Sequence, residues 1–261
     1  MRRPFLALVL ALAPAVGQAG CTRDLSVGIS ELGFGAYLQD GKWRGLAPDL
    51  VAELARRSGC HVKFVSRPRA RLLLEFERGQ LDLITSAMRA EERDRVGQFL
   101  PYAYATMDLI FVGDSPPRSL EALRRRPDLK LGIVRGVRLG RLKDGVDALL
   151  AARQAEYSPD YDNLAAKLSA GRLQAAIIPS VIHAKLRRDG LLPAHAVTVD
   201  LPENSPEAIG LYLHRANIPQ VDQQQLQRHL EAMRREGWVQ ASYVRYVGEA
   251  ETRRLFRSEA R

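Results

Sequence analysis

Strand-like and helix-like segments alternate along this chain from residue 24 onward, and this rhythm limits the possible fold more than any other feature. The strand-like segments are short and apolar, and they lie at 25–30, 62–66 and 81–85. Each is followed by a helix-like segment, at 48–58, 69–78 and 91–96. Repeats of this kind place parallel strands side by side and cover the sheet with helices. The pattern predicts an α/β fold.

A second α/β unit is predicted after a strong structural breaker. The apolar run 107–112 ends at the segment 113–117 (Gly-Asp-Ser-Pro-Pro), which cannot continue a regular element. The elements expected next are helix 120–125 with Ser119 as its cap, strand 131–134, helices 141–153 and 160–170, strand 175–178 and helix 180–188. A strand at 209–213 and helices at 221–236 and 239–247 then return to the first unit.

Two Rossmann-like lobes are therefore expected, joined by a two-strand hinge. The predicted boundaries are 22–112 plus 208–250 for lobe I, 113–207 for lobe II, and 251–261 for a loosely ordered tail. The chain would cross between the lobes near 106–114 and again near 200–208. Because ligand sites of α/β folds form at the carboxyl ends of the strands, the cleft between the lobes is the predicted binding site.

The first nineteen residues have the pattern of a signal peptide. Arg2 and Arg3 form a basic start, residues 5–16 are apolar, and the segment ends in Gly17-Gln18-Ala19. The apolar run is too short to span a bilayer comfortably. A signal peptide at 1–19 is preferred over a buried N-terminal helix, and it predicts an exported, periplasmic protein.

Cys21 and Cys60 are the only cysteines, and each shortly precedes a strand-like run. If those runs are adjacent parallel strands, both cysteines lie at the same edge of the sheet, and a disulfide is natural in an oxidising compartment. The alternative is a lipid anchor on Cys21. Ala19-Gly20 fit a lipidation motif, but Gln18 stands where an aliphatic residue is expected, and Cys60 would be left single. The disulfide is the preferred interpretation.

The formal charge of +9 comes mostly from arginine, but the basic residues do not form a pattern typical of a nucleic-acid site. The basic runs 124–126 and 187–188 are short and are not interleaved with aromatic residues. The five histidines lack the spacing of zinc ligands. The glycines within 132–140 match no phosphate-binding loop. We therefore expect no nucleic-acid partner, no metal and no cofactor.

The segment 79–93 is the most informative for function. The apolar run 81–84 breaks into Thr85-Ser86, a pair suited to capping a helix, and Arg93 follows about two turns later. A strand that runs into a helix N-terminus directs free backbone N–H groups at one point, which suits an anion. The planar guanidinium of Arg93 can hold a carboxylate with two hydrogen bonds. The alternative is an ordinary strand–helix joint with a solvated arginine.

The order of motifs along the chain resembles the family 3 periplasmic solute-binding proteins, the polar amino-acid receptors of ABC importers. The similar motifs are Gly79-x-Leu-Asp-x-Ile84 with Ser86, Met88 and Arg93, then Val96-x-x-Phe99-x-Pro101-Tyr102, Gly45 to Leu50, and Leu226 to Trp238 with Tyr243 and Tyr246. The resemblance covers nearly the whole chain after residue 22. It implies the type II periplasmic binding protein fold, a Venus-flytrap architecture that closes on a small-molecule ligand. It also implies an amino acid or related organic acid as ligand, an inner-membrane ABC permease as partner, and a monomer.

The resemblance also implies which residues of lobe I contact the ligand. Arg93 matches the carboxylate-binding arginine, and Ser86 a hydroxyl position; the N–H groups after Ser86, on Ala87 and Met88, would share the carboxylate. Met88 replaces a small polar residue of the family. Two further positions follow the first strand: Glu31 would pair with a ligand cation, and Phe34 would cover the apolar part of the ligand.

Three departures from the family pattern bear on the ligand. Gly136-Val137 stand where the family has Gly-Thr, so a threonine hydroxyl is absent. Pro179 stands where typical members have the aspartate that receives the ligand's ammonium group, and Arg69 stands near a position where the family often has an aromatic residue. If Arg69 faces the cleft, the site carries two guanidinium groups and favours a solute more anionic than an ordinary amino acid. The alternative is that Arg69 faces solvent and Pro179 only shapes a turn.

The resemblance leaves two other functions to consider. Cyclohexadienyl dehydratases resemble these receptors, but Glu31 is the only acid that can be placed in the cleft with any reason, so an enzyme is not expected. A receptor that reports to a sensor or a membrane partner would use the same closing motion as a transport receptor. The sequence therefore favours solute capture for ABC-type import and leaves the sensing role open.

Overall fold

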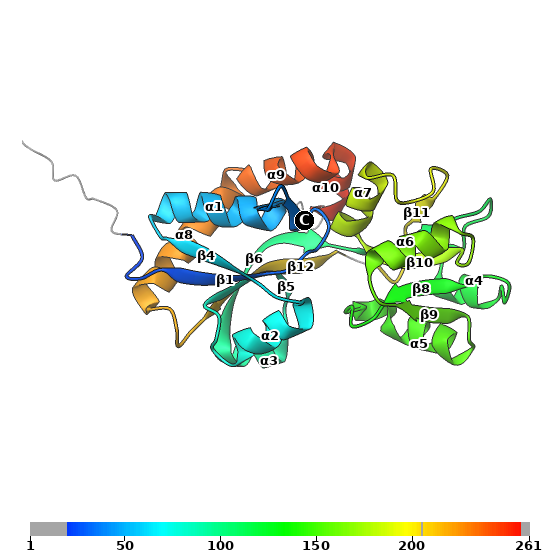
Figure 1. Cartoon of the computed structure of the whole chain (residues 1–261), viewed down its shortest axis with the longest axis horizontal. Coiled ribbons are helices and arrows are strands. Elements are labelled where there is room, and N and C mark those ends of the chain that lie inside the picture. Colours follow the sequence, from blue (N-terminus) through cyan, green and yellow to red (C-terminus); the bar gives the residue numbers. More distant parts are fainter. Residues whose placement is uncertain (1–19, 205, 257–261) are drawn as a thin grey trace, which may run out of the picture.

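Two five-stranded sheets, each covered by helices, form the body of the molecule (Figure 1). The structure is a computed structural model and describes residues 20–204 and 206–256. The predicted signal peptide at 1–19 lies outside the described residues. None of the helices in those two ranges has the length and apolar character needed to cross a membrane.

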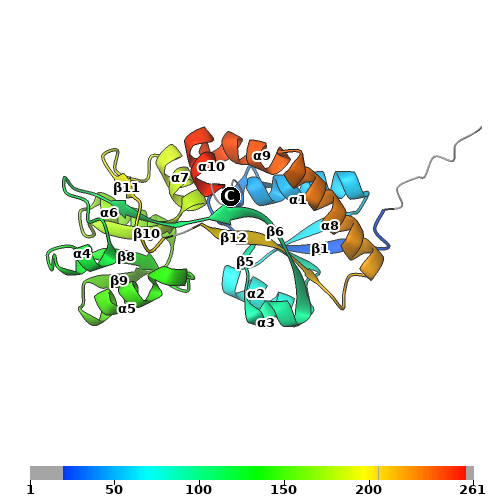
Figure 2. The ribbon, with the colours of Figure 1, turned by 180° about the vertical axis from the view of Figure 1, so that it is seen from behind.

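The first sheet has the strand order β4-β1-β5-β12-β6. Its strands are β1 (Leu25–Ile29), β4 (Val62–Ser66), β5 (Leu83–Met88), β6 (Gly97–Ala105) and β12 (Glu207–His214). Strands β1, β4 and β5 run parallel, as the alternating pattern predicts. Its helices are α1 (Leu46–Ser58), α2 (Arg69–Glu77), α3 (Glu91–Val96), α8 (Gln220–Arg235), α9 (Trp238–Val247) and α10 (Glu249–Leu255). Helices α2 and α3 cover one face, and the other four lie on the opposite face (Figure 2).

The second sheet has the order β11-β7-β10-β8-β9. Its strands are β7 (Met107–Phe111), β8 (Leu131–Val134), β9 (Ala155–Ser158), β10 (Ala175–Pro179) and β11 (Val197–Val199). Its helices are α4 (Leu120–Arg124), the short 3-10 helix η1 (Gly140–Leu142), α5 (Lys143–Ala151), α6 (Tyr161–Ser169) and α7 (Ser180–Arg188). The Ser119 side chain accepts a hydrogen bond from the Ala122 amide, which confirms the predicted cap of α4.

The structure moves one predicted boundary between the two units. Strand β7 pairs with β10 and β11, so residues 107–111 belong to the second sheet and not to lobe I. The first crossing is therefore Thr106, between β6 and β7. The physical reason is the buried apolar run of β7, which needs neighbours on both sides.

Besides β6, three strands were not expected from the sequence. Strands β2 (Tyr37–Gln39) and β3 (Lys42–Arg44) form a hairpin whose turn residues Asp40 and Gly41 both have positive φ, the conformation that Asp-Gly favours in two-residue turns. Strand β9 adds an edge to the second sheet.

The C-terminal segment also differs from expectation. Residues 249–255 form helix α10, with Leu255 fully buried, so the part of the predicted loose tail that the structure describes is ordered. Residues 257–261 lie outside the described part of the chain. Helix α10 is held in place because Arg254 donates hydrogen bonds to the buried carboxylate of Asp108 on β7.

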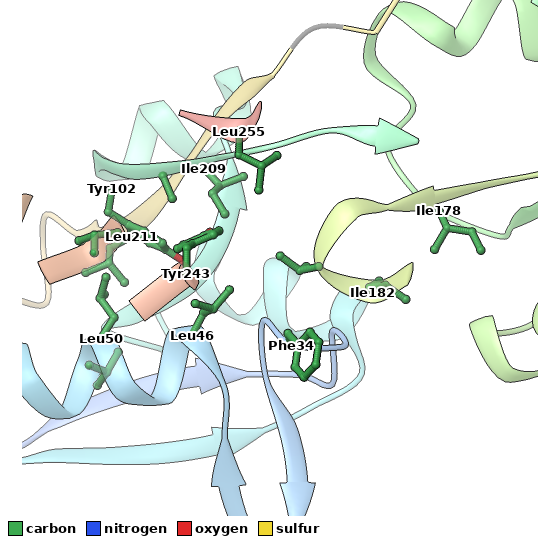
Figure 3. Close-up of a cluster of buried hydrophobic side chains, with 14 of the residues drawn as sticks. Phe34, Leu46, Leu50, Tyr102, Ile178, Ile182, Ile209, Leu211, Tyr243 and Leu255 are labelled. Atoms are coloured by element: carbon green, nitrogen blue, oxygen red, sulfur yellow. The ribbon is translucent and has the colours of Figure 1, made fainter. Parts of the chain in front are cut away.

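The apolar core continues from the first unit into the second. One cluster of buried side chains includes Phe34 and Leu46 of the first unit and Ile178 and Ile182 of the second. Phe34 lies between Leu46 and Ile182 (Figure 3). The Phe34 amide donates a hydrogen bond to the Val181 carbonyl at 2.9 Å. This contact ties the loop after β1 to helix α7.

Cys21 and Cys60 form a disulfide, with their Cα atoms 4.6 Å apart. The bridge joins the ends of adjacent parallel strands β1 and β4, which confirms the pairing predicted from the sequence. The thiol of Cys21 is therefore part of the disulfide in this structure.

Replacing both cysteines by serine is expected to lower the free energy of unfolding by about 2–4 kcal/mol, because the bridge closes a long loop in the unfolded chain. Urea denaturation of the oxidised protein and of the Cys21→Ser/Cys60→Ser variant measures this difference. Adding a reductant should destabilise the oxidised protein and leave the variant unchanged. Equal unfolding midpoints for the two proteins would contradict a stabilising role of the disulfide.

Candidate functional site

The carboxyl end of β5 has a different local structure from the one predicted. Strand β5 continues through Met88, and α3 begins only at Glu91, after an extended Ala90 that provides no side-chain cap. Thr85-Ser86 therefore do not cap a helix. Ala87 and Met88 pair with Gly210 and Ile209 of β12, so their backbone belongs to the sheet and not to a free helix N-terminus. The predicted helix-capping pair is wrong because the ladder with β12 extends the strand.

Ser86 lies in a bulge of β5. Its φ is 50°, and the pairing register with β12 shifts at this point. Positive φ is uncommon outside glycine and often marks a functional position. Both the amide and the Oγ of Ser86 lie within hydrogen-bond distance of the Tyr102 hydroxyl, at 3.2 and 3.1 Å. Tyr102 is buried, and its burial raises the pKa of its phenol, so the hydroxyl keeps its proton.

Arg93 lies just inside the surface beside this bulge. The residue is 5% exposed, and its guanidinium lies over the Tyr212 ring, 5.6 Å from the ring centre. One Nη donates to the Met88 carbonyl at 3.1 Å, and the other lies 3.5 Å from a carboxylate oxygen of Glu77. Its buried Nε has no hydrogen-bond partner among the described residues. The guanidinium therefore has donor capacity that the protein itself does not use.

Arg69 is the first residue of α2 and is partly buried. Its two Nη groups donate to the carbonyl oxygens of Thr85 and Ser86, at 3.1 and 2.9 Å. It therefore lies at the carboxyl end of β5, not on the outer surface of α2. Burial and the charge of Arg93 together lower the pKa of Arg69 to about 10. The two guanidinium groups bind carbonyl groups two residues apart on β5, those of Ser86 and Met88.

The other predicted residues of lobe I lie in different environments. Glu31 is exposed and has no hydrogen-bond or ion-pair partner within the described ranges. Phe34 is 2% exposed and contacts Tyr37, Tyr246 and the guanidinium of Arg188, whose central carbon is 4.3 Å from the ring centre. In this arrangement of the lobes the Phe34 ring is covered by protein. Its role toward a ligand stays a prediction.

Ala87 and Met88 differ in what they can offer to a ligand. Ala87 is fully buried in a small apolar cluster with Leu72, Phe76 and Tyr212, so its side chain is used for packing. Met88 is partly exposed and lines a cavity between the two units. Its carbonyl accepts the hydrogen bond from Arg93.

The second unit presents Gly136 and Val137 on the loop after β8. Gly136 is exposed with a φ of 78°, and Val137 is partly buried against the core of the second unit. Pro179 ends β10 and directly precedes α7. Neither Pro179 nor Ser180 carries a carboxylate, so this strand end offers no acid to a ligand cation.

Arg138, which the sequence did not single out, connects the two predicted binding segments. One Nη donates to the Arg89 carbonyl at 3.2 Å, and the other contacts a carboxylate oxygen of Glu92 at the same distance. The loop after β8 thus meets the loop before α3. Met88 and Ala105 on one side and Leu139 and Leu142 on the other line a cavity of about 10 Å³, which has room for about one water molecule.

A buried ionic network lies where the two crossings meet. Asp108 of β7 is 0% exposed and accepts hydrogen bonds from Arg254 of α10 at 2.6 and 2.9 Å. His183 of α7 lies 2.7 Å from the same carboxylate. Thr106 of the first crossing and Asn204 of the second join the network through Arg254 and Asp108.

Asp108, His183 and Glu251 bring their possible ligand atoms within 4.8 Å of one another, a geometry that could suggest a metal site. Arg254 donates to both oxygens of Asp108 and to Glu251. The two carboxylates therefore already share a guanidinium as hydrogen-bond donor. The cluster is a structural ion-pair network that ties α10 and α7 to β7.

The sequence profile of the bacterial extracellular solute-binding proteins, family 3, matches residues 25–249. A probable histidine-binding protein of Campylobacter jejuni is 27% identical over 143 residues, which is 54% of this chain and 54% of that protein. The match thus spans about half the length of this curated relative.

Solved structures with a similar fold cover most of the chain. An ancestral arginine-binding protein bound to glutamine has a TM-score of 0.68 at 22% identity, over 87% of this chain and 98% of its own. A histidine kinase sensor domain with similarity to periplasmic binding proteins has a TM-score of 0.68 at 19% identity, over 87% and 96%. At these identities the likeness concerns the fold.

Proposed function

Because the chain belongs to the bacterial extracellular solute-binding proteins of family 3, we propose that it captures a small carboxylate-bearing solute between its two lobes. Its fold is that of the type II periplasmic binding proteins, with two α/β lobes and two crossings. The proposed solute is an amino acid or a related organic acid. Lobe I is the unit built on the first sheet, and lobe II is the unit built on the second sheet.

The observation that carries this proposal is the position of Arg93. Its guanidinium binds the Met88 carbonyl at the carboxyl end of β5. The next residue, Arg89, accepts a hydrogen bond from Arg138 of the second unit. Its buried Nε lacks an acceptor, and a buried donor without a partner costs about 1–3 kcal/mol. A solute carboxylate would supply the missing acceptor and two strong charge-assisted hydrogen bonds.

Closure of the lobes would follow from the same geometry. A solute held by Arg93 in lobe I would next meet the loop that carries Gly136 and Val137 in lobe II. Binding to both lobes stabilises the closed form relative to the open one. The exposed pair of Arg138 and Glu92 already bridges these loops, but an exposed ion pair contributes at most about 1 kcal/mol. This ion pair alone would therefore not hold the two loops together.

The partner and compartment follow from the family. Family 3 solute-binding proteins are periplasmic or extracellular proteins, and we infer export by the predicted signal peptide at 1–19 followed by periplasmic residence. An inner-membrane ABC permease is the proposed partner of a monomeric receptor. The relatives are binding proteins, and the exposed, unpaired Glu31 lacks the enclosed setting of a catalytic acid, so we propose binding without catalysis.

A sensing role is the second candidate. The sensor domain of a histidine kinase is among the structures with this fold, so the same closing motion can serve a signalling partner. In that case the closed form would be read by a membrane sensor and not by a permease. Binding of the purified protein to detergent-solubilised permease or to a sensor ectodomain, with and without solute, distinguishes the two.

A thermal-shift screen tests the proposal directly. The protein is stripped of bound solute by unfolding and refolding, then melted with amino acids, dicarboxylates, other small organic acids and prephenate-like compounds. A carboxylate solute at about 100 times its Kd should stabilise the protein by about 2.7 kcal/mol and raise Tm by about 5–10 °C. Amines without a carboxylate, such as ethanolamine, serve as controls. No saturable shift with any carboxylate would overturn the proposal.

A further inference from the structure

We propose that Arg69 and Arg93 together bind a solute with two anionic groups, such as a dicarboxylate or an acidic amino acid. This inference rests on the proposed function, because it assumes that Arg93 holds one carboxylate. It adds the class of solute and assigns Arg69 the role of selecting it.

The position of Arg69 is fixed by the end of β4 and the bulge of β5. Strand β5 pairs with β1 only as far as Ile84, so the next two carbonyl groups are free on that side. Arg69 donates to both of these carbonyl groups, those of Thr85 and Ser86. These two hydrogen bonds hold a long side chain against the strand end. Little conformational entropy would then be lost when the guanidinium binds a ligand.

The charge of Arg69 is not balanced by the protein. No carboxylate among the described residues forms an ion pair with it, and its two hydrogen-bond acceptors are neutral carbonyl oxygens. Burial, followed by the like charge of Arg93, lowers the pKa of Arg69 to about 10, so Arg69 is still a cation at neutral pH. An anion bound between the two guanidinium groups would offset their repulsion.

Three nearby arginines of the same lobe are paired with acids. Arg67 and Arg71 both pair with Glu75, and Arg89 pairs with Asp94. Arg69 stands among these paired arginines without an acid. An arginine held near the strand end and left unpaired is suited to an external anion.

The opposite lobe also favours an anionic solute. Strand β10 ends at Pro179 and α7 begins at Ser180, and neither residue provides an acid for a ligand cation. The relatives named above are described as binding histidine and arginine, whose side chains are basic. Two neighbouring guanidinium groups would repel such a side chain, so this chain should prefer the opposite charge.

Isothermal titration calorimetry tests the inference with pairs of solutes that are similar in size and differ by one carboxylate charge. L-Glutamate is compared with L-glutamine, L-aspartate with L-asparagine, and succinate and L-malate with butyrate, each on wild-type protein. L-Arginine and L-histidine test the basic alternative. We expect at least one solute with two carboxylates (called dianionic below) to bind about tenfold or more tightly than its counterpart with one carboxylate (called neutral below, for the uncharged group that replaces the second carboxylate).

Three variants assign the effect to Arg69. Arg69→Gln should weaken binding of the dianionic solute about 30-fold or more and that of its neutral counterpart less than about threefold. Arg69→Lys keeps the charge and should retain more of the affinity than the glutamine variant. Arg71→Gln removes an exposed arginine of the same helix and should change neither Kd. Thermal melting of each variant verifies that it is folded.

The outcomes separate this inference from the proposed function. If a monocarboxylate or a basic amino acid binds tightly and no dianionic solute binds with higher affinity, the proposed role of Arg69 is overturned. The proposed capture of a solute would still stand. An equal loss for charged and neutral solutes in Arg69→Gln would show a merely structural role and would also overturn it. Failure of the wild type to bind any carboxylate would overturn the proposed function itself. If Arg69→Gln does not fold, the comparison of Arg69→Lys with the wild type, across charged and neutral solutes, decides.

Discussion

Arg93→Ala is expected to weaken binding of the carboxylate solute by about 2–4 kcal/mol, which is a factor of about 30 to 1,000 in Kd. Arg93 is 5% exposed, so a carboxylate paired with it is largely removed from water. Without the guanidinium of Arg93, the desolvated carboxylate of the solute would have no compensating positive charge. Calorimetric titration of wild type and variant with the solute found in the screen measures the difference.

The variant must be separated from a general loss of structure. Arg93 also lies over the Tyr212 ring and donates to Met88, so some loss of stability is expected from its removal. Arg95→Ala is the matched control, because Arg95 lies on the same short helix but is exposed and pairs only with Glu91. It should bind the solute as the wild type does. Equal affinities of wild type and a folded Arg93→Ala protein would exclude Arg93 from the site.

Elements with strong local signals could be predicted from the sequence. The apolar run of β4 and the first and last residues of α3 agree with expectation, and Ser119 caps α4 as its position suggested. The disulfide could be predicted because the parallel pairing of β1 and β4 places both cysteines at one edge. In each case neighbours in the chain, or one simple pairing, determine the structure.

Strand β6 was missed because of Pro101. Proline lacks the N–H that a central strand needs, which argues against a strand. β6 lies at the edge of the first sheet, where one side of the strand needs no partner strand, so the proline is tolerated. With β6 unrecognised, the role of Tyr102 as partner of Ser86 could not be predicted. The period-two burial of Leu100 and Tyr102 was the available signal.

The helix cap at Thr85-Ser86 was inferred from residue type, and tertiary pairing overrode it. Serine and threonine are common both at caps and in strands, and the distant strand β12 decides between the two. The same applies to Phe34, whose burial depends on α7, about 150 residues away in the sequence. Contacts of this range have no local signal in a single sequence. The placement of Arg69 at the strand end likewise needed the structure.

Arg254→Ala is expected to lower the free energy of unfolding by about 3–5 kcal/mol, because it leaves a buried carboxylate without its main cation. Asp108 is 0% exposed, and Arg254 donates to both of its oxygens. Urea denaturation at neutral pH measures the loss. Arg253→Ala, on the exposed face of the same helix, should stay within about 0.5 kcal/mol of the wild type. Comparable losses in both variants would show that any change in α10 is destabilising.

The pH dependence of this loss in the free energy of unfolding shows whether Arg254 stabilises the protein by its charge or by packing. Burial raises the pKa of Asp108, but hydrogen bonds from His183 and Arg254 outweigh it, and the pKa lies below its ordinary value of 3.8. A carboxyl group of lowered pKa contributes its stability above the pKa of the unfolded chain and loses it as the pH falls through the folded value. The gap between wild type and Arg254→Ala should therefore narrow below about pH 4, because protonated Asp108 no longer needs the arginine. Arg254→Ala/Asp108→Asn, which removes both charges, should recover part of the loss at neutral pH. A gap that is the same at every pH would mean that Arg254 holds α10 on the hinge by packing alone.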